Sequence, residues 1–321
     1  MRWPRPYLAL AAAAPGGPVW RMGRPEAAEL EADAGDLADP VGEGGRSPLP
    51  HLVCKHPDRA LLLVTRRCHF YCRFCFRRGA GPGGEPRPGE LEAALAWIAE
   101  RPAVREVILS GGDPLTLEDR RLAELLGRLA EIPHVETVRI HTRAPIHYPE
   151  RVTAGLVAAL AQGPPAWLVV HANHPVELTP AVAAALGRLR QAGLPLLDQS
   201  VLLRGVNDAT ATLEALFRAL YRLGVRPYYL HHPDRAPGNR SFRLPLATGL
   251  RLVRPLRHRL PGPALPRYVV DLPDGSGKVE VEALTPLDGG RYRWEDPATG
   301  RSVTFRDIPE AAASPSGPIC R

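Results

Sequence analysis

Three cysteines with the spacing Cys-x3-Cys-x2-Cys constrain this chain more than any other feature of its sequence. Cys68, Cys72 and Cys75 follow a short apolar run that predicts a strand. Thiolates are soft ligands that suit iron–sulfur clusters and zinc. A four-iron cluster is usually held by four cysteines, so three in one loop leave one iron free to chelate a small molecule. The spacing therefore predicts an iron–sulfur cluster, and the alternative is a zinc site completed by His69 or Cys54.

The chain around and after this loop alternates between strand-like and helical patterns. Short apolar runs predict strands, which fall at 61–65, 106–110, 137–142, 167–172, 194–200, 227–231 and 268–271. Amphipathic stretches predict helices between them, which fall at 89–100, 117–131, 180–191 and 210–223. Repeated strand–helix units indicate a parallel sheet with right-handed crossovers. Six units are fewer than the eight of a complete barrel, so we expect an α/β fold with a partial (β/α)6 barrel.

Composition divides the chain into three parts. Residues 1–50 are rich in Ala, Gly, Pro and acidic side chains, which predicts a loose, partly helical N-terminal arm. Residues 51–282 carry the strand and helix patterns and are expected to form the barrel. Residues 283–321 return to a Pro-, Gly- and Ser-rich composition, which predicts a short C-terminal tail.

The charge pattern limits the partners of this chain. Its formal net charge of +7 comes from arginines that are scattered rather than gathered in a tract. This argues against a nucleic-acid partner and suits anionic cofactors and a carboxylate substrate. The odd total of five cysteines fits a reducing compartment better than a disulfide framework, and no apolar run is long enough to cross a membrane. The first residues loosely resemble a signal peptide, but an oxygen-sensitive cluster indicates a cytoplasmic protein.

The cysteine loop resembles that of the radical S-adenosylmethionine superfamily. The resemblance implies a [4Fe-4S] cluster whose open iron binds S-adenosylmethionine, and which cleaves it to a 5′-deoxyadenosyl radical. In that superfamily a glycine-rich stretch after the second strand receives the methionine amino group. The counterpart here consists of Ser110, Gly111, Gly112 and Asp113. The resemblance also implies that His171 and Gln199 contact cofactor.

Over residues 57–281 the chain resembles one family more closely, that of lysine 2,3-aminomutase, which includes the lysine isomerase that serves elongation factor P. Matching stretches occur in order at 57–59, 68–78, 110–113, 134–135, 139–140, 171–175, 199–208, 226–229 and 270–278. The resemblance implies a pyridoxal-phosphate-dependent isomerase that interconverts L-lysine and β-lysine by migration of the 2-amino group to carbon 3. It also implies an electron donor such as flavodoxin or ferredoxin.

The second cofactor depends on a lysine near the end of the predicted barrel. Lys278 follows a flexible turn, 275–277, and matches the family's lysine that forms a Schiff base with pyridoxal phosphate. From the residues alone, an exposed hairpin lysine is the simpler interpretation. Arg59 matches a residue near the cofactor ring. The family has Arg-Tyr where this chain has Lys55 and His56, so Lys55 keeps a cation for the phosphate while the exact contacts are left open.

Three further positions bear on the substrate. Arg77 matches the arginine that pairs with the substrate carboxylate, and a planar guanidinium can donate two parallel hydrogen bonds to such a group. Asp234 and Asp271 match two aspartates that hold the ε-ammonium of lysine. Two carboxylates closing on one ammonium would select a diamino acid over glutamate. The alternative is that both aspartates are strand-end caps or surface ion pairs.

The chain also departs from its family. The longer relatives carry a zinc site, but Ala209 stands where one of its cysteines falls and only Cys320 lies near the C-terminus, so no zinc is predicted. The short C-terminal extension leaves the family's homo-oligomer open. Two other interpretations remain. One is an aminomutase for another amino acid such as arginine. The other is a nucleic-acid- or metal-binding module that uses the cluster structurally.

Overall fold

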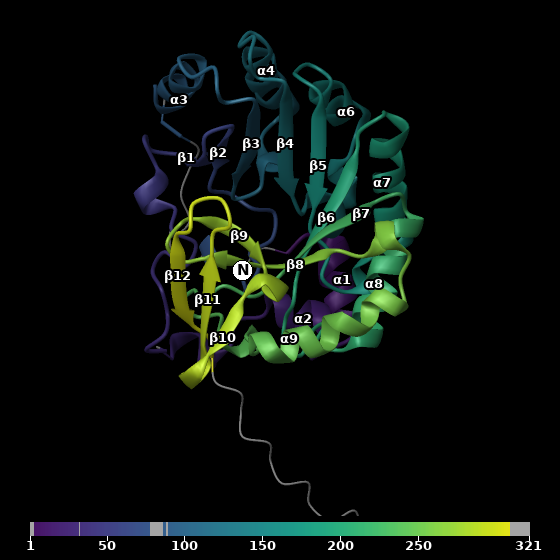
Figure 1. Cartoon of the computed structure of the whole chain (residues 1–321). Coiled ribbons are helices and arrows are strands. Elements are labelled where there is room, and N and C mark those ends of the chain that lie inside the picture. The colour runs from purple at the N-terminus through teal and green to yellow at the C-terminus, as the bar shows by residue number, and fades with distance from the viewer. Residues whose placement is uncertain (1–2, 32, 78–85, 88, 309–321) are drawn as a thin grey trace, which may run out of the picture.

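The computed structural model describes residues 3–31, 33–77, 86–87 and 89–308, and its centre is one open sheet of nine strands. The strands lie side by side in chain order (Figure 1). Seven of them, β2 to β8, are parallel, and the strand at each edge is antiparallel to its neighbour. The strands are β1 (Leu52–His56), β2 (Arg59–Thr65), β3 (Glu106–Gly111), β4 (Thr137–Thr142), β5 (Ala166–Val170), β6 (Leu196–Val201), β7 (Arg226–His231), β8 (Arg267–Leu272) and β9 (Gly277–Glu280).

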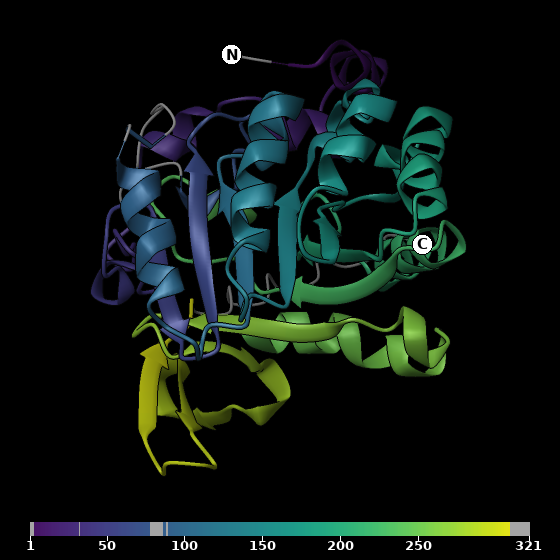
Figure 2. The same cartoon turned by 90° about the horizontal axis from the view of Figure 1, so that it is seen from above.

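Helices connect the parallel strands and cover the outside of the sheet (Figure 2). They are α3 (Glu90–Ala99), α4 (Asp119–Ala130), α5 (Ala144–His147), α6 (Ala154–Leu160), α7 (Pro180–Gln191), α8 (Thr210–Arg222) and α9 (Leu246–Val253). α4 illustrates why: its buried side chains are Leu122, Leu125, Leu126 and Leu129, which fall on one helix face. The predicted partial (β/α)6 barrel is confirmed, with β8 following the sixth crossover. The sequence patterns missed β1, β9, α5, α6 and α9.

The N-terminal arm is more ordered than its composition predicts. It contains α1 (Arg5–Ala13) and α2 (Pro18–Gly23). Both lie at the end of the barrel where the parallel strands finish (Figures 1 and 2). Tyr7 and Met22 from these helices pack with Phe70 of the cysteine loop in a second, small hydrophobic cluster. The arm therefore covers the loop that carries the three cysteines.

The segment expected to be a C-terminal tail instead forms a three-stranded antiparallel sheet. Its strands are β10 (Thr285–Leu287), β11 (Arg291–Glu295) and β12 (Ser302–Arg306). In β11, Tyr292 and Trp294 alternate with exposed arginines, and Tyr292 stacks on Phe305 of β12. These aromatic side chains pack against the main core, which the Pro- and Gly-rich composition did not indicate. Cys320 lies outside the described residues.

Candidate active site

The cysteine loop begins where β2 ends, and the glycine pair at the end of β3 supports it. Gly112 donates a backbone hydrogen bond to Thr65 O at 2.6 Å. A Cβ on Gly112 would lie 2.1 Å from Arg67 O, and one on Gly111, where φ is +123°, would lie 2.1 Å from Thr65 O. The glycines are thus required by close packing against the loop backbone, and not only by approach to a ligand.

Asp113 ties this packing to the next strand. Its Oδ1 accepts hydrogen bonds from the Thr142 hydroxyl at 2.6 Å and from Leu115 N at 3.0 Å. Its Oδ2 accepts one from Arg143 N at 2.9 Å. The carboxylate is buried and joins the ends of β3 and β4. Asp113 therefore has a structural role beside its expected cofactor contact, while Ser110 precedes the glycines at the end of β3.

The three cysteines are partly exposed thiols in this loop. Burial raises the pKa of the Cys68 thiol, and the nearby Asp113 adds to the shift. Burial also raises the pKa of Cys72, and the Arg143 guanidinium partly offsets this shift because it favours the thiolate. Within the described ranges, no group of three or more His, Cys, Asp or Glu side chains is arranged to hold a metal ion. The donor set itself, three thiols from one loop, fits an iron–sulfur cluster by its chemistry.

The two residues that would complete a zinc site have other contacts. The thiol of Cys54 donates to His56 O at 3.2 Å within β1. His69 Nε2 lies 3.3 Å from Leu115 O, and its ring packs on Tyr148 with centroids 5.0 Å apart. These contacts favour the three-cysteine interpretation over a zinc knuckle.

Inside the barrel, polar side chains line the ends of β4, β5 and β6. Gln199 Nε2 lies 2.7 Å from His171 Nε2 and 3.1 Å from His141 Nδ1. Burial lowers the pKa of His171 to about 3, so its ring is neutral. Burial raises the pKa of Asp198 to about 7, although Ser200 and Ala172 donate hydrogen bonds to its carboxylate. Neutral hydrogen-bonding groups therefore meet at His171 and Gln199, and His141 and Asp198 were missed because neither stands in a recognisable motif.

The lysine turn closes the far edge of the sheet. Lys278 pairs with Asp271 across the β8–β9 hairpin, and its Nζ donates to Asp271 Oδ1 at 3.1 Å. The other oxygen of Asp271 lies 3.5 Å from His231 Nδ1. Burial alone would raise the pKa of Asp271, but Lys278 and His231 hold it well below its usual range. Lys278 is about one-third exposed, so its amine is accessible as well as oriented.

Asp234 and Asp271 line one cavity of about 210 Å³, which also reaches the C-terminal segment at Phe305 and Asp307. Burial raises the pKa of Asp234 to about 8, and the charge of Asp271 adds to the shift. The carboxyl of Asp234 is therefore largely protonated at neutral pH and would gain from a cation placed beside it. Neither aspartate is a surface ion pair.

The N-terminal arm supplies an unexpected partner at this site. Arg77 Nη2 donates to Glu43 Oε1 at 2.6 Å, and Nη1 donates to the other oxygen. Lys55 Nζ donates to the backbone oxygen of Val41 in the same arm segment. Burial lowers the pKa of Lys55, and the negative charges of Asp271 and Glu43 partly offset this shift. Thus Arg77, expected to bind the substrate carboxylate, is paired with Glu43, and Lys55, expected to bind the cofactor phosphate, contacts the same arm segment.

The arm also packs directly on the lysine turn. Gly42 and Gly275 both have positive φ, and a Cβ on Gly42 would lie 2.3 Å from Gly275 N. This backbone contact holds the arm against the turn that carries Lys278. Arg59, expected near the cofactor ring, pairs with Asp58 at 3.1 Å at the start of β2.

The two lysines of the chain lie in this one region. Lysine occurs in the sequence only at positions 55 and 278, whereas arginine provides the remaining basic side chains. Their charges interact, since the positive charge of Lys278 is among the factors that lower the pKa of Lys55. An amine can form an imine and a guanidinium cannot, so these two positions are the side chains of the chain that could carry such chemistry.

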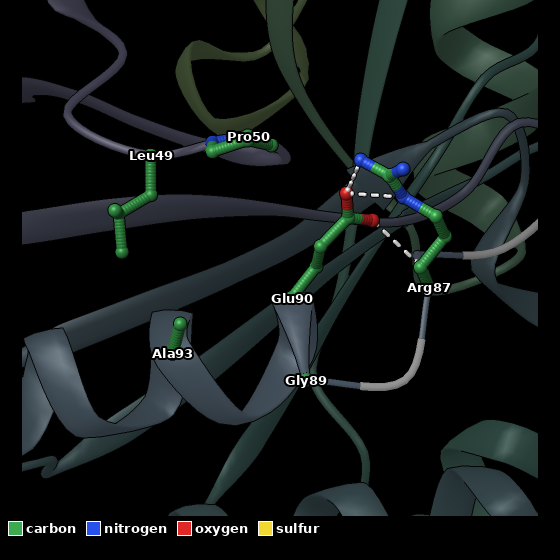
Figure 3. Close-up of a pocket in the computed structure, with 6 residues that line it drawn as sticks. All are labelled: Leu49, Pro50, Arg87, Gly89, Glu90 and Ala93. Atoms are coloured by element: carbon green, nitrogen blue, oxygen red, sulfur yellow. Dashed lines mark hydrogen bonds and ion pairs between the residues drawn. The ribbon is translucent and has the colours of Figure 1, made fainter.

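A shallow pocket on the outside of the molecule contains none of these residues (Figure 3). It is lined by Leu49, Pro50, Arg87, Gly89, Glu90 and Ala93. The side chains of Arg87 and Glu90 point toward each other and form an ion pair at 2.7 Å. The candidate site residues therefore lie inside the barrel, in the N-terminal arm and in the β8–β9 hairpin, and not at this pocket.

Comparison with known proteins defines first the class and then the family. The model of the "Radical SAM superfamily" matches residues 62–216. The fold is similar to that of Streptococcus suis SuiB bound to S-adenosylmethionine, with a TM-score of 0.51 and 13% identity over 66% of this chain and 50% of that one. The matched family model identifies a radical S-adenosylmethionine domain in this chain, and the solved structure has a similar fold.

Curated relatives are much more similar in sequence. The chain is 43% identical to a "Putative L-lysine 2,3-aminomutase" of Treponema pallidum, over 78% of this chain and 71% of the relative. It is 44% identical to the "L-lysine 2,3-aminomutase" of Clostridium subterminale over 83% of this chain, and spans 65% of that relative's length. A "Glutamate 2,3-aminomutase" of Clostridioides difficile is 35% identical over 82% of this chain and 63% of its own length. The chain belongs to the lysine 2,3-aminomutase family.

Proposed function

We propose that this chain is a radical S-adenosylmethionine, pyridoxal-phosphate-dependent aminomutase that interconverts L-lysine and β-lysine. The observation that carries the proposal is the carboxyl pair of Asp234 and Asp271, which lines one cavity beside Lys278. A lysine substrate presents one carboxylate and two amines. The guanidinium of Arg77 suits the substrate carboxylate, and the two carboxyl groups suit the ε-ammonium. Lys278 would hold the cofactor that reacts with the other amine.

The proposed cofactors are assigned to residues by their chemistry. Cys68, Cys72 and Cys75 would hold the [4Fe-4S] cluster, and Lys278 would hold pyridoxal phosphate. When bound, the cluster with S-adenosylmethionine supplies a hydrogen-abstracting radical, and pyridoxal phosphate carries the migrating nitrogen. Lys55 is close enough to Lys278 for the charge of Lys278 to lower its pKa, and it is the proposed cation for the phosphate. Arg59 is the proposed neighbour of the ring.

Substrate choice follows from charge at the distal end of the substrate. The ε-ammonium of lysine placed between Asp234 and Asp271 would favour the ionised form of Asp234, whose pKa burial raises to about 8. A glutamate side chain would instead bring a third carboxylate to this pair, which is unfavourable. This is why we assign lysine rather than glutamate, although a relative is named for glutamate.

Lys278 has two tasks in this arrangement. Its ammonium neutralises Asp271 in the ligand-free chain, at 3.1 Å. To react with a carbonyl the Lys278 amine must first lose a proton. The ring of His231 reaches Lys278 through Asp271.

The setting of the reaction is part of the proposal. The electron would come from flavodoxin or ferredoxin in the cytoplasm, and a homo-oligomer is compatible with the family. No helix in the described part of the chain is both long and apolar enough to span a membrane. The product could serve elongation factor P or a small-molecule route.

The test is turnover by protein rebuilt anaerobically with iron, sulfide and pyridoxal phosphate. With a reductant and S-adenosylmethionine, we expect L-lysine to give β-lysine and arginine or glutamate to give no β-amino acid. Turnover of arginine or glutamate instead of lysine would reject the substrate assignment. Iron uptake without any 5′-deoxyadenosine would favour a cluster with a structural role.

A further inference from the structure

Arg143 is a buried arginine that none of the assignments above uses. It follows β4, and its side chain is only 8% exposed. Nη1 donates to Cys72 Sγ at 2.7 Å, and Nε donates to His171 O at 3.1 Å. Nη2 donates to Glu177 Oε1 at 2.6 Å and to the hydroxyl of Tyr7 at 3.2 Å. One guanidinium thus joins the cysteine loop, the end of β5 and the N-terminal arm.

Its position is fixed from several sides. Glu177 is fully buried, and its Oε2 accepts hydrogen bonds from Asn173 N at 2.6 Å and His174 N at 2.9 Å. The hydroxyl of Tyr7 donates to Glu177 Oε1 at 2.7 Å. The ring of Phe74 lies 5.5 Å from the guanidinium carbon. Glu177 therefore anchors Arg143 and also places a negative charge close to it.

We propose that Arg143 positions Cys72 and raises the reduction potential of the cluster, and that Glu177 limits this effect. The inference rests on the proposed cluster at Cys68, Cys72 and Cys75. A hydrogen bond to a ligand sulfur and a nearby positive charge both stabilise the reduced form, which carries the extra electron. Burial strengthens the effect because the surrounding dielectric is low. Arg143 acts through Cys72 and is a positioning residue.

The proposal gives opposite signs for two substitutions. Arg143→Gln removes the positive charge, so the potential should become more negative. Glu177→Gln removes the opposing negative charge and keeps a side chain of the same shape, so the potential should become less negative. We expect each to change the equilibrium constant for reduction at least tenfold, which is about 59 mV for a one-electron couple. Arg143→Lys keeps the charge and should stay between Arg143→Gln and the unaltered protein.

The measurement is a redox titration of the full chain, rebuilt with iron and sulfide and followed by electron paramagnetic resonance without substrate. Arg105→Gln is the matched control, because Arg105 is an exposed arginine that pairs with Glu136 at 2.6 Å and should not move the potential. Shifts of the same sign for Arg143→Gln and Glu177→Gln, or no shift at full iron content, would overturn the proposal. If Arg143→Gln fails to hold iron, the Glu177→Gln and Arg143→Lys potentials decide it.

These outcomes are separate from those that test the proposed function. If the unaltered protein takes up no iron and sulfide, the proposed cluster itself is wrong. If it does, and its potential is insensitive to both Arg143→Gln and Glu177→Gln, the cluster stands and the role proposed for Arg143 and Glu177 is wrong.

Discussion

Glu43 and Arg77 form a two-pronged ion pair that joins the N-terminal arm to the cysteine loop across 34 residues of sequence. Both side chains are largely buried, with 17% and 20% exposed. Arg77 is the group proposed to bind the substrate carboxylate, so in the ligand-free chain a carboxylate of the protein already occupies it. An incoming carboxylate must share or replace this contact.

Glu43→Gln should therefore strengthen lysine binding. The amide cannot compete for the guanidinium as the carboxylate does, and a charge-assisted hydrogen bond is worth about 1.5 kcal/mol or more, which is roughly tenfold in affinity. The check is lysine titration against the absorbance of bound pyridoxal phosphate. Glu92→Gln is the control, because Glu92 forms a similar two-pronged pair with Arg128 on the exposed surface. Weaker binding in Glu43→Gln would mean that Glu43 orients Arg77 instead.

Lysine affinity should rise with pH up to about pH 8. Burial raises the pKa of Asp234 to about 8, so below that pH the folded protein holds a proton there. An ammonium ligand prefers the ionised carboxylate, so its binding releases the proton and is favoured as pH rises. The affinity should grow by up to about tenfold per pH unit below 8. Asp234→Asn should bind lysine more weakly and lose this pH dependence, whereas an unchanged profile would contradict the assignment.

Borohydride reduction should attach pyridoxal phosphate to Lys278 and not to Lys55. Only these two lysines exist, so a mass of the labelled peptide distinguishes them. Lys278→Arg keeps a cation beside Asp271 but cannot form an imine, so covalent attachment should be lost. Lys55→Arg should keep attachment and weaken cofactor retention. Label on Lys55 in the unaltered protein would contradict the assignment of Lys278.

Gly112→Ala should destabilise the cysteine loop. The new Cβ would lie 2.1 Å from Arg67 O, a backbone atom that cannot move alone. We expect a loss of about 1–3 kcal/mol in unfolding free energy and a lower iron content after reconstitution. Gly127→Ala is the control, because that site on α4 has open space and alanine favours a helix by about 0.5–1 kcal/mol. Equal stability of the two variants would show that the loop adapts.

Much of the barrel could be read from the sequence because its pattern is local. Apolar runs and helical periodicity identified β2 to β8 and four of the outer helices to within a few residues. The C-terminal sheet was missed for the opposite reason. Its strands are stabilised by Tyr292 and Trp294 packing against the core and by Phe305 across the strand pair, and not by a long apolar run.

The sequence alone supplied the cysteine spacing and the Gly111–Gly112 pair and, through a family resemblance, the candidate residues Arg77, Asp234, Asp271 and Lys278. What each of them faces was decided only by the tertiary structure. Arg77 meets Glu43, Cys72 meets Arg143, and Asp271 lies between Lys278 and His231. Asp271 and Lys278 are neighbours in one hairpin, but the other pairs come from segments distant in sequence, so no local pattern encodes them. Their charges and pKa values depend on burial and distance, which exist only once the chain has folded.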